Sequence, residues 1–244
     1  MTHPASQPRM ERPVTADSIA AVDHAITSRR SIRQFLPTPV PRDTIEDILR
    51  VASRAPSGTN TQPWQVHVLT GPTLQTLVDK IMAAYNDPAQ ADTHQPEYDY
   101  YPPKWISPFI DRRRKVGWDL YGLLGIEKAD KDRMQVQQGR NFCFFDAPVG
   151  LIFSINRIMG KGSWLDYGMF LQNVMVAARA RGLDTCPQAA FNHYHHLISE
   201  HLGINAEQDM LVVGMSLGHA DPAAIENTLL TEREPVTQFA KFLD

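Results

Sequence analysis

The 244-residue chain has little of what marks several protein classes. Its two cysteines are too few for a disulfide framework, so free thiols in a reducing compartment are expected. Lys plus Arg number 24 against 27 Asp plus Glu, whereas nucleic-acid-binding domains are usually basic. No run of eighteen apolar residues occurs, and residues 1–13 hold no apolar signal-peptide segment. We therefore expect a cytoplasmic protein without nucleic-acid or membrane partners.

The composition that is present, 43% hydrophobic and 21% charged, is that of an ordinary globular domain. Residues 1–14 are polar and predict a flexible tail, and residues 15–244 predict a single domain. Inside it, residues 86–140 open with a stretch that lacks periodicity and predict an inserted lid. Residues 220–244 are poor in apolar side chains and predict a C-terminal arm.

Apolar periodicity predicts long helices separated by a few short strands. The expected helices cover residues 17–30, 45–52, 74–82, 105–124, 130–142, 163–181 and 195–202, and the expected strands cover 65–69, 148–153 and 210–215. This order favours a sheet covered by helices, without fixing its topology.

The expected helix over 163–181 is the most apolar segment. It opens with Ser163-Trp-Leu-Asp166, similar to a capping box, and has apolar residues on most faces. Such a helix is buried nearly all round. It is either the central helix of a monomer or a helix at a dimer interface.

Two polar segments carry the strongest chemical signal. The first, Ser28-Arg-Arg-Ser-Ile-Arg33, offers guanidinium groups for a phosphate or another anion. In extended backbone Arg29, Ser31 and Arg33 point to one face. The second, Ala55-Pro-Ser-Gly-Thr-Asn-Thr-Gln-Pro-Trp64, is crowded with small donors and acceptors that suit the edge of a heterocycle.

Together these segments resemble the nitroreductase family, flavoprotein homodimers that bind FMN. The resemblance continues through Gly182–Ala190, Leu211–Gly218 and Asn227–Pro235, and covers residues 20–242. It implies an α+β fold with a central, mostly antiparallel sheet covered by helices, in an intertwined homodimer. Residues 182–190 would form a flavin-facing loop after the central helix.

The resemblance also assigns cofactor contacts. Arg29 and Ser31 would hold the phosphate and ribityl end of FMN, with Arg233 joining Arg29 at the phosphate. Arg30 would contribute through its backbone or the ribityl edge, and Arg33 would lie near the N1–C2 oxygen edge. The remaining contacts would come from Pro56, Ser57, Gly58, Asn60 and Gln62 of a second subunit and from Pro187, Gln188 and Ala189 on the N5 side.

The implied activity is hydride transfer from NAD(P)H through the flavin to a nitroaromatic compound. The product would be a hydroxylamine or an amine, formed with ping-pong kinetics. No side chain is assigned as a general acid or base, because the cofactor carries the difficult step. A reductive dehalogenase of the same flavin family and a non-catalytic FMN-binding or storage protein are the alternatives.

The expected insertion supplies candidate substrate contacts. Aromatic side chains there can stack on a flat substrate or pin the insertion to the body. The candidates are Tyr98, Tyr101, Trp105 and Phe109. Arg112–Lys115 is a basic run that is either a solvated helix face or a site of attraction for a nicotinamide phosphate or an anionic nitroarene. Glu97, Tyr101 and Lys104 are faintly similar to a dehalogenase lid, although Pro102-Pro103 would break its helix.

Two rival motifs are weaker. Gly214-Met-Ser216-Leu-Gly218 matches a nucleophile elbow, but no acid lies between Ser216 and the single later histidine, His219. The histidines at 193, 195, 196 and 201 fit no zinc spacing, so no metal is expected and they are placed on the outer face of a helix.

Overall fold

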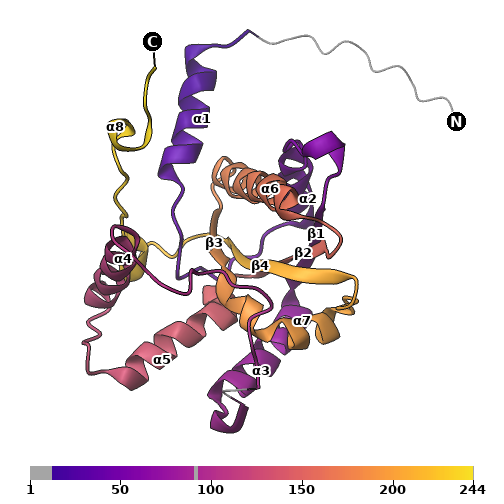
Figure 1. The fold of residues 1–244 in the computed structure, drawn as a ribbon, viewed down its shortest axis with the longest axis vertical. Coiled ribbons are helices and arrows are strands. Elements are labelled where there is room, and N and C mark those ends of the chain that lie inside the picture. The colour runs from indigo at the N-terminus through magenta and orange to yellow at the C-terminus, as the bar shows by residue number, and fades with distance from the viewer. Residues whose placement is uncertain (1–12, 91–92, 244) are drawn as a thin grey trace, which may run out of the picture.

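A four-stranded antiparallel sheet forms the centre of the computed structural model, which describes residues 13–90 and 93–243 (Figure 1). The strands are β1 (Trp64–Thr70), β2 (Val149–Asn156), β3 (Asp184–Gln188) and β4 (Asp209–Gly218), in the order β1-β2-β4-β3. The expected α+β fold with an antiparallel sheet is confirmed. The expected tail, residues 1–14, lies almost wholly outside the described residues.

Helices cover both faces of this sheet. Their bounds are α1 Ala16–Ser28, α2 Arg42–Ala52, α3 Gly71–Asn86, α4 Phe109–Leu123, α5 Lys131–Gly139, α6 Lys161–Arg179, α7 His195–Leu202 and α8 Val236–Phe239. Short 3-10 turns, η1 to η5, span Gly58–Asn60, Pro88–Gln90, Arg140–Asp146, Ala189–Tyr194 and Ile225–Thr228. In the described part of the chain, no helix is both long and apolar enough to cross a membrane.

The two central strands are buried on both faces, because successive side chains point to opposite sides and helices cover both sides. Leu151 and Phe153 of β2 enter the core beneath α2 and α6, whereas Ile152 enters the core beneath α3, α7 and η3. Under α6, Phe170 stacks on Trp64 with ring centroids 4.7 Å apart. This double burial explains why β2 and β4 are predominantly apolar in the sequence.

Strand β3 was not expected, since residues 182–190 had been assigned to a loop. It pairs with β4 over residues 184–188 and receives an isolated bridge from Ser31 on its other side. Pro187 has no N–H to donate, which the edge of a sheet tolerates. The polar sequence Asp-Thr-Cys-Pro-Gln therefore becomes a strand only through pairing with a buried neighbour.

Helix α6 also differs from expectation. It begins at Lys161, two residues before the expected capping box, and its N-cap, Gly160, forms no side-chain cap. Tyr167, Phe170 and Val174 are buried, but Leu165 is 73% exposed and Met169 40% exposed. The helix is thus buried on one face only, and a single chain leaves an apolar stripe on the other.

The outer part of the insertion and both terminal segments are largely exposed. Helix α4 begins at Phe109 rather than at Trp105, and α5 ends at Gly139 and continues as η3. Helix α1 rises from the body, and the arm carrying α8 extends in the same direction (Figure 1). Apolar side chains on both are exposed, among them Ile19, Val22 and Ile26 of α1 and Phe239 and Phe242 of the arm.

A strained turn joins η3 to β2. Phe144, Phe145 and Asp146 have φ of 49°, 52° and 64°, in the left-handed region that costs roughly 1–2 kcal/mol for each non-glycine residue. Both phenylalanines are buried, and the Phe145 carbonyl accepts the Phe35 N–H at 3.1 Å. Core packing therefore holds a turn that local preference disfavours.

Gly214→Ala should destabilise the protein, because a Cβ there would lie 2.2 Å from the buried Phe191 ring. Overpacking of this kind costs about 1–3 kcal/mol. Thermal unfolding should show a Tm lower by roughly 2–4 °C for each kcal/mol lost. The matched control is Gly117→Ala in α4, where no atom lies within 4 Å of the added Cβ. An equal Tm for both variants would contradict the packing argument.

Candidate functional site

The arginine-rich segment leaves α1 and runs beside β3. The Ile32 N–H donates to the Thr185 carbonyl at 3.2 Å, and the Ile32 side chain is buried. The residues on either side of Ile32 turn the other way. Burial raises the pKa of Cys186 to about 11, and Arg33, Ser31 and Arg29 oppose this rise from close by. All three side chains thus lie near Cys186, which agrees with the prediction that Arg29, Ser31 and Arg33 share one face.

Arg29 and Arg233 form a pair of like charges. The pKa of Arg29 is lowered by its partial burial and by the neighbouring Arg233 guanidinium. Within residues 13–90 and 93–243 neither has a carboxylate partner, and Arg233 donates only to Thr231 and the Glu232 carbonyl. Two neighbouring cations without a carboxylate partner suit a phosphate, which accepts several charge-assisted hydrogen bonds.

Asn227, which the sequence reasoning missed, fixes the arginine-rich segment to the C-terminal arm. Its Oδ1 accepts the Arg33 N–H at 2.8 Å, and its Nδ2 donates to the Gln34 carbonyl at 2.8 Å. Arg30 reaches the Asn227 carbonyl at 3.4 Å. Because an asparagine amide both donates and accepts, one side chain sets the backbone from which Arg33 projects.

Arg140 is a second residue that the sequence reasoning missed. Its guanidinium contacts the Arg33 carbonyl at 3.4 Å, the Gln34 side chain and Asp146 at 3.2 Å. Its Nε is buried and has no hydrogen-bond partner among the described residues. A buried donor without a partner is costly, so an acceptor supplied by a ligand would satisfy it. These partners are distant in the chain or belong to the strained turn, which is why no sequence signal marks Arg140.

These features fit FMN. The paired Arg29 and Arg233 suit its phosphate, while Arg33 and the unsatisfied Arg140 Nε suit an oxygen-rich ring edge. Backbone at the end of β3 completes the arrangement at Pro187–Ala189. The Gln188 side chain does not face this site. It turns inward, donating to the Asn141 carbonyl at 2.5 Å and accepting from Ser216 Oγ at 2.6 Å.

Ser216 has a structural role. It is buried within β4, and its hydroxyl lies 2.8 Å from the Phe144 carbonyl as well as beside Gln188. Strand β4 runs on to Gly218 with no helix directly after it. A nucleophile elbow needs an exposed hydroxyl between a strand and a helix, so the Gly-Met-Ser-Leu-Gly match does not form one.

A cavity of about 840 Å³ lies between residues 187–194 and the insertion. Tyr98 and Tyr101 line it, together with Phe142 and Tyr194 from the opposite side. Trp105 and Phe109 do not line it: Trp105 packs against Tyr101, and Phe109 is 54% exposed at the start of α4. Two of the four expected substrate contacts therefore reach the cavity in a single chain.

The base of the insertion is fastened to the body by several polar contacts. Asn192 accepts the Glu97 N–H at 3.0 Å and donates to the Tyr98 carbonyl at 2.9 Å. The Tyr98 hydroxyl donates to the Val212 carbonyl at 2.5 Å, and burial raises the pKa of Tyr98 to about 12. Tyr98 therefore remains a protonated, fixed wall of the cavity.

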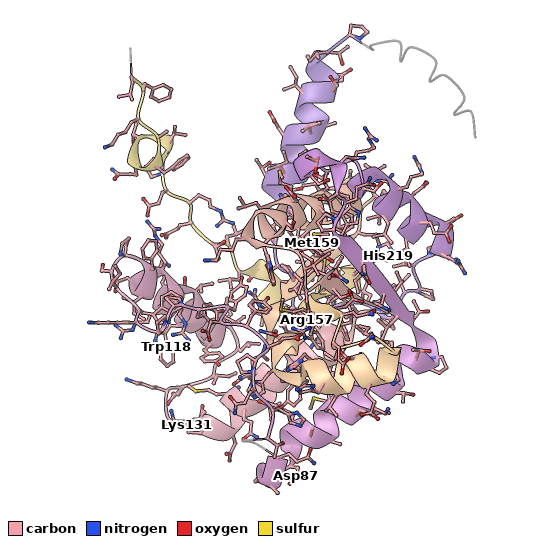
Figure 2. All side chains as sticks on the ribbon, turned by 45° about the vertical axis from the view of Figure 1, so that its right-hand side comes forward. Asp87, Trp118, Lys131, Arg157, Met159 and His219 are labelled. Carbon is pink, nitrogen blue, oxygen red and sulfur yellow. The ribbon has the colours of Figure 1, made fainter. Side chains whose placement is uncertain are left out.

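Glu97 is part of the same fastening. Its buried carboxylate pairs with Arg157, labelled in the body of the molecule in Figure 2, and accepts the Leu211 N–H at 3.0 Å. His195 also lies beside it, buried rather than on the outer helix face that we expected. The similarity of Glu97, Tyr101 and Lys104 to a dehalogenase lid therefore does not hold at Glu97, whose carboxylate is engaged internally.

The polar loop 56–62 lies at the far end of α6 from the arginines. The Gly58 N–H donates to Asp166 Oδ2 at 3.1 Å, so Asp166 holds the polar loop rather than capping α6, which begins earlier at Lys161. Asn60 and Gln62 have φ of 60° and 49°, and the loop is largely exposed. Asp166 is thus a further residue missed from the sequence, since it positions the turn.

The length of α6 separates the two halves of the expected site. Asp166 meets the polar loop near its start, and Arg179 meets Ser28 at its end at 2.9 Å. Arg179 follows Asp166 by 13 positions, which corresponds to about 20 Å at 1.5 Å per residue. The halves therefore lie at opposite ends of one helix within a chain.

The chain is similar to known proteins over most of its length. Residues 26–219 match the family model described as "Nitroreductase family". The chain is 44% identical to a 4-nitrobenzoate reductase of Pseudomonas putida over 91% of its length and 95% of the relative's. It is 38% identical to a nitrobenzene nitroreductase of Ectopseudomonas oleovorans, covering 91% and 96%. The structure of the FMN- and NADPH-dependent nitroreductase NfnB of Sphigopyxis sp. strain HMH superposes with a TM-score of 0.87 at 37% identity, covering 91% and 99%.

Arg233→Ala should weaken FMN binding, because it removes one of the two cations that lack a counter-ion. The loss of a charged hydrogen bond predicts about 1.5–3 kcal/mol, measured by titrating flavin into the apoprotein. Arg50→Ala is the matched control, since Arg50 pairs with Asp47 on the surface of α2. An unchanged FMN affinity for Arg233→Ala would remove this residue from the site.

Proposed function

The chain belongs to the nitroreductase family, and we propose that it reduces nitroaromatic compounds at an FMN bound between two copies of the chain. The observation that carries the proposal is the arginine-rich segment beside β3, where Ser31 bridges to Thr185 and Arg29 lies near Arg233. Within residues 13–90 and 93–243 neither arginine has a carboxylate partner. A protein tolerates such a pair when a bound anion compensates it. The buried, unsatisfied Arg140 Nε supports the same conclusion.

When bound, FMN would accept a hydride from NAD(P)H and deliver it to the nitro group. The chain would bind and orient the reactants. Arg29 and Arg233 hold the phosphate, and Arg33 is kept in place by Asn227 beside the ring edge that gains negative charge. A fixed cation at that edge favours the reduced cofactor, at about 1.5–3 kcal/mol for each charged hydrogen bond. Reduction to the hydroxylamine takes two NAD(P)H and two protons, and releases water.

The second half of the site would come from another copy. The polar loop lies about 20 Å along α6 from the arginines of its own chain. It would therefore contact the FMN that is bound by the arginines of the second copy, through Pro56, Ser57, Gly58, Asn60 and Gln62. The exposed apolar stripe of α6 and the exposed faces of α1 and the C-terminal arm support a large interface between copies.

The acceptor class follows from the cavity. Tyr98, Tyr101, Phe142 and Tyr194 provide aromatic surfaces that suit a flat ring, beside the backbone at Pro187–Ala189. The relatives support the same class, since two are named for the reduction of 4-nitrobenzoate and of nitrobenzene. NADPH is the proposed donor, because the similar NfnB is described as NADPH-dependent.

Anaerobic mixing of the flavin-loaded protein with NADPH should bleach the flavin, and adding a nitroarene should restore its colour. Nicotinamide and nitroarene must each come within about 3–3.5 Å of the reacting atom, so they occupy the same position in turn. Double-reciprocal plots should therefore be parallel. Intersecting lines would defeat the shared-position argument, and the absence of bleaching would favour flavin storage over catalysis.

Mixed dimers test the shared site. Arg29→Ala removes the phosphate contact, and Asn60→Gly removes the loop amide while keeping the left-handed backbone. If each site combines the arginines of one chain with the loop of the other, a dimer of the two variants contains one intact site and one doubly defective site. Its FMN content and activity per dimer should approach half of wild type and exceed those of either variant. Values no higher than those of the parents would place both halves in one chain.

A further inference from the structure

Arg113 differs from the cations next to it on α4. Arg112 pairs with Glu234 at 2.6 Å, and Lys115 pairs with Asp119 at 2.7 Å. Arg113 instead lies over aromatic rings, with its guanidinium carbon 4.9 Å from the Trp105 ring centroid and 5.4 Å from that of Tyr101. Across residues 13–90 and 93–243 it has no carboxylate partner.

Stacking uses only the faces of the guanidinium. Its N–H donors lie in the plane of the group, and none of them bonds to a described residue. The rings limit where the side chain can move, so its position is more defined than that of a free surface arginine. Arg113 is therefore a held cation with unused donors, and a carboxylate is the partner that its planar geometry matches.

The cavity beside it contains no such cation. Tyr101, which stacks under Arg113, is part of the cavity wall, but no lysine or arginine lines the cavity. Asp99 is its acidic side chain and would repel an anionic group placed against it. An acceptor with a negative end would avoid Asp99 and turn that end toward the cation behind Tyr101.

We propose that Arg113 selects acceptors that carry a carboxylate on the ring opposite the nitro group. The aromatic ring would lie in the cavity, the nitro group would face Pro187–Ala189, and the carboxylate would extend past the exposed Tyr101 ring to the Arg113 N–H donors. This inference rests on the proposed function, and it names a specificity-determining residue outside the cofactor site.

Arg113→Met tests the inference, since methionine keeps an apolar contact with the two rings and removes the charge. The kcat/KM for 4-nitrobenzoate should fall about tenfold, the size of a partly solvated charged hydrogen bond. The kcat/KM for 4-nitrobenzamide, which has the same shape without the charge, should change less than about twofold. Arg113→Lys should recover part of the loss, because it restores the charge without the planar fork.

Two controls separate local from general effects. Arg112→Met removes an equal charge one residue away, and should leave the ratio of the two kcat/KM values near that of wild type. The rate of flavin bleaching by NADPH should be unchanged in Arg113→Met. An equal loss of kcat/KM for the acid and the amide would overturn the proposal. So would a slower flavin bleaching by NADPH with unchanged kcat/KM for the nitro compounds, because that result would assign Arg113 to the nicotinamide phosphate.

Calorimetric binding to the oxidised holoprotein keeps this test independent of turnover. Wild type should bind 4-nitrobenzoate more tightly than 4-nitrobenzamide, and Arg113→Met should lose that preference. If neither compound is reduced, the proposed function fails, while the binding preference still decides the role of Arg113. Equal affinities of wild type for the acid and the amide would overturn the inference about Arg113.

Discussion

The packing of α6 across one face of the sheet sets the geometry on which the site depends. Phe170 and Tyr167 lock the helix to Trp64 and Phe153, so its two ends have fixed positions relative to the strands. At one end Asp166 holds the polar loop, and at the other Arg179 holds the exit of α1. A rigid helix thus carries two partial sites that a single chain does not join, and this separation favours assembly.

A second constraint acts around Arg33. The arginine-rich segment has extended backbone, and neighbouring elements supply its hydrogen bonds: β3 through Thr185, the C-terminal arm through Asn227, and η3 through Arg140. These contacts place several cations close together. Their mutual repulsion costs stability in the isolated chain, and a bound phosphate and ring edge would remove that cost. The strained turn at Phe144–Asp146 contributes to this by bringing Arg140 into place.

The insertion combines a fixed base with an exposed outer part. Glu97 and Tyr98 are bonded to η4 and β4, whereas Tyr100 and Tyr101 are more than half exposed. Its far end meets the C-terminal arm through Arg112 and Glu234. The wall nearest the proposed reacting position is thus the most firmly held. The part that would contact the far end of a substrate is attached by aromatic stacking and a surface ion pair, where substitutions cost the fold least.

The sequence alone was enough to predict the class of fold, the strands β1, β2 and β4, and most helices, and it marked the arginine-rich segment. Periodicity and charge pattern are local properties that can be read directly from the sequence. It could not reveal β3, whose polar residues form a strand only beside buried β4, nor the exposed stripe on α6, because apolar residues on most faces of a helix fit either full burial or an interface. The roles of Asn227, Arg140, Asp166 and Glu97 were equally hidden. Each joins segments far apart in the chain, and only tertiary packing decides which distant groups meet.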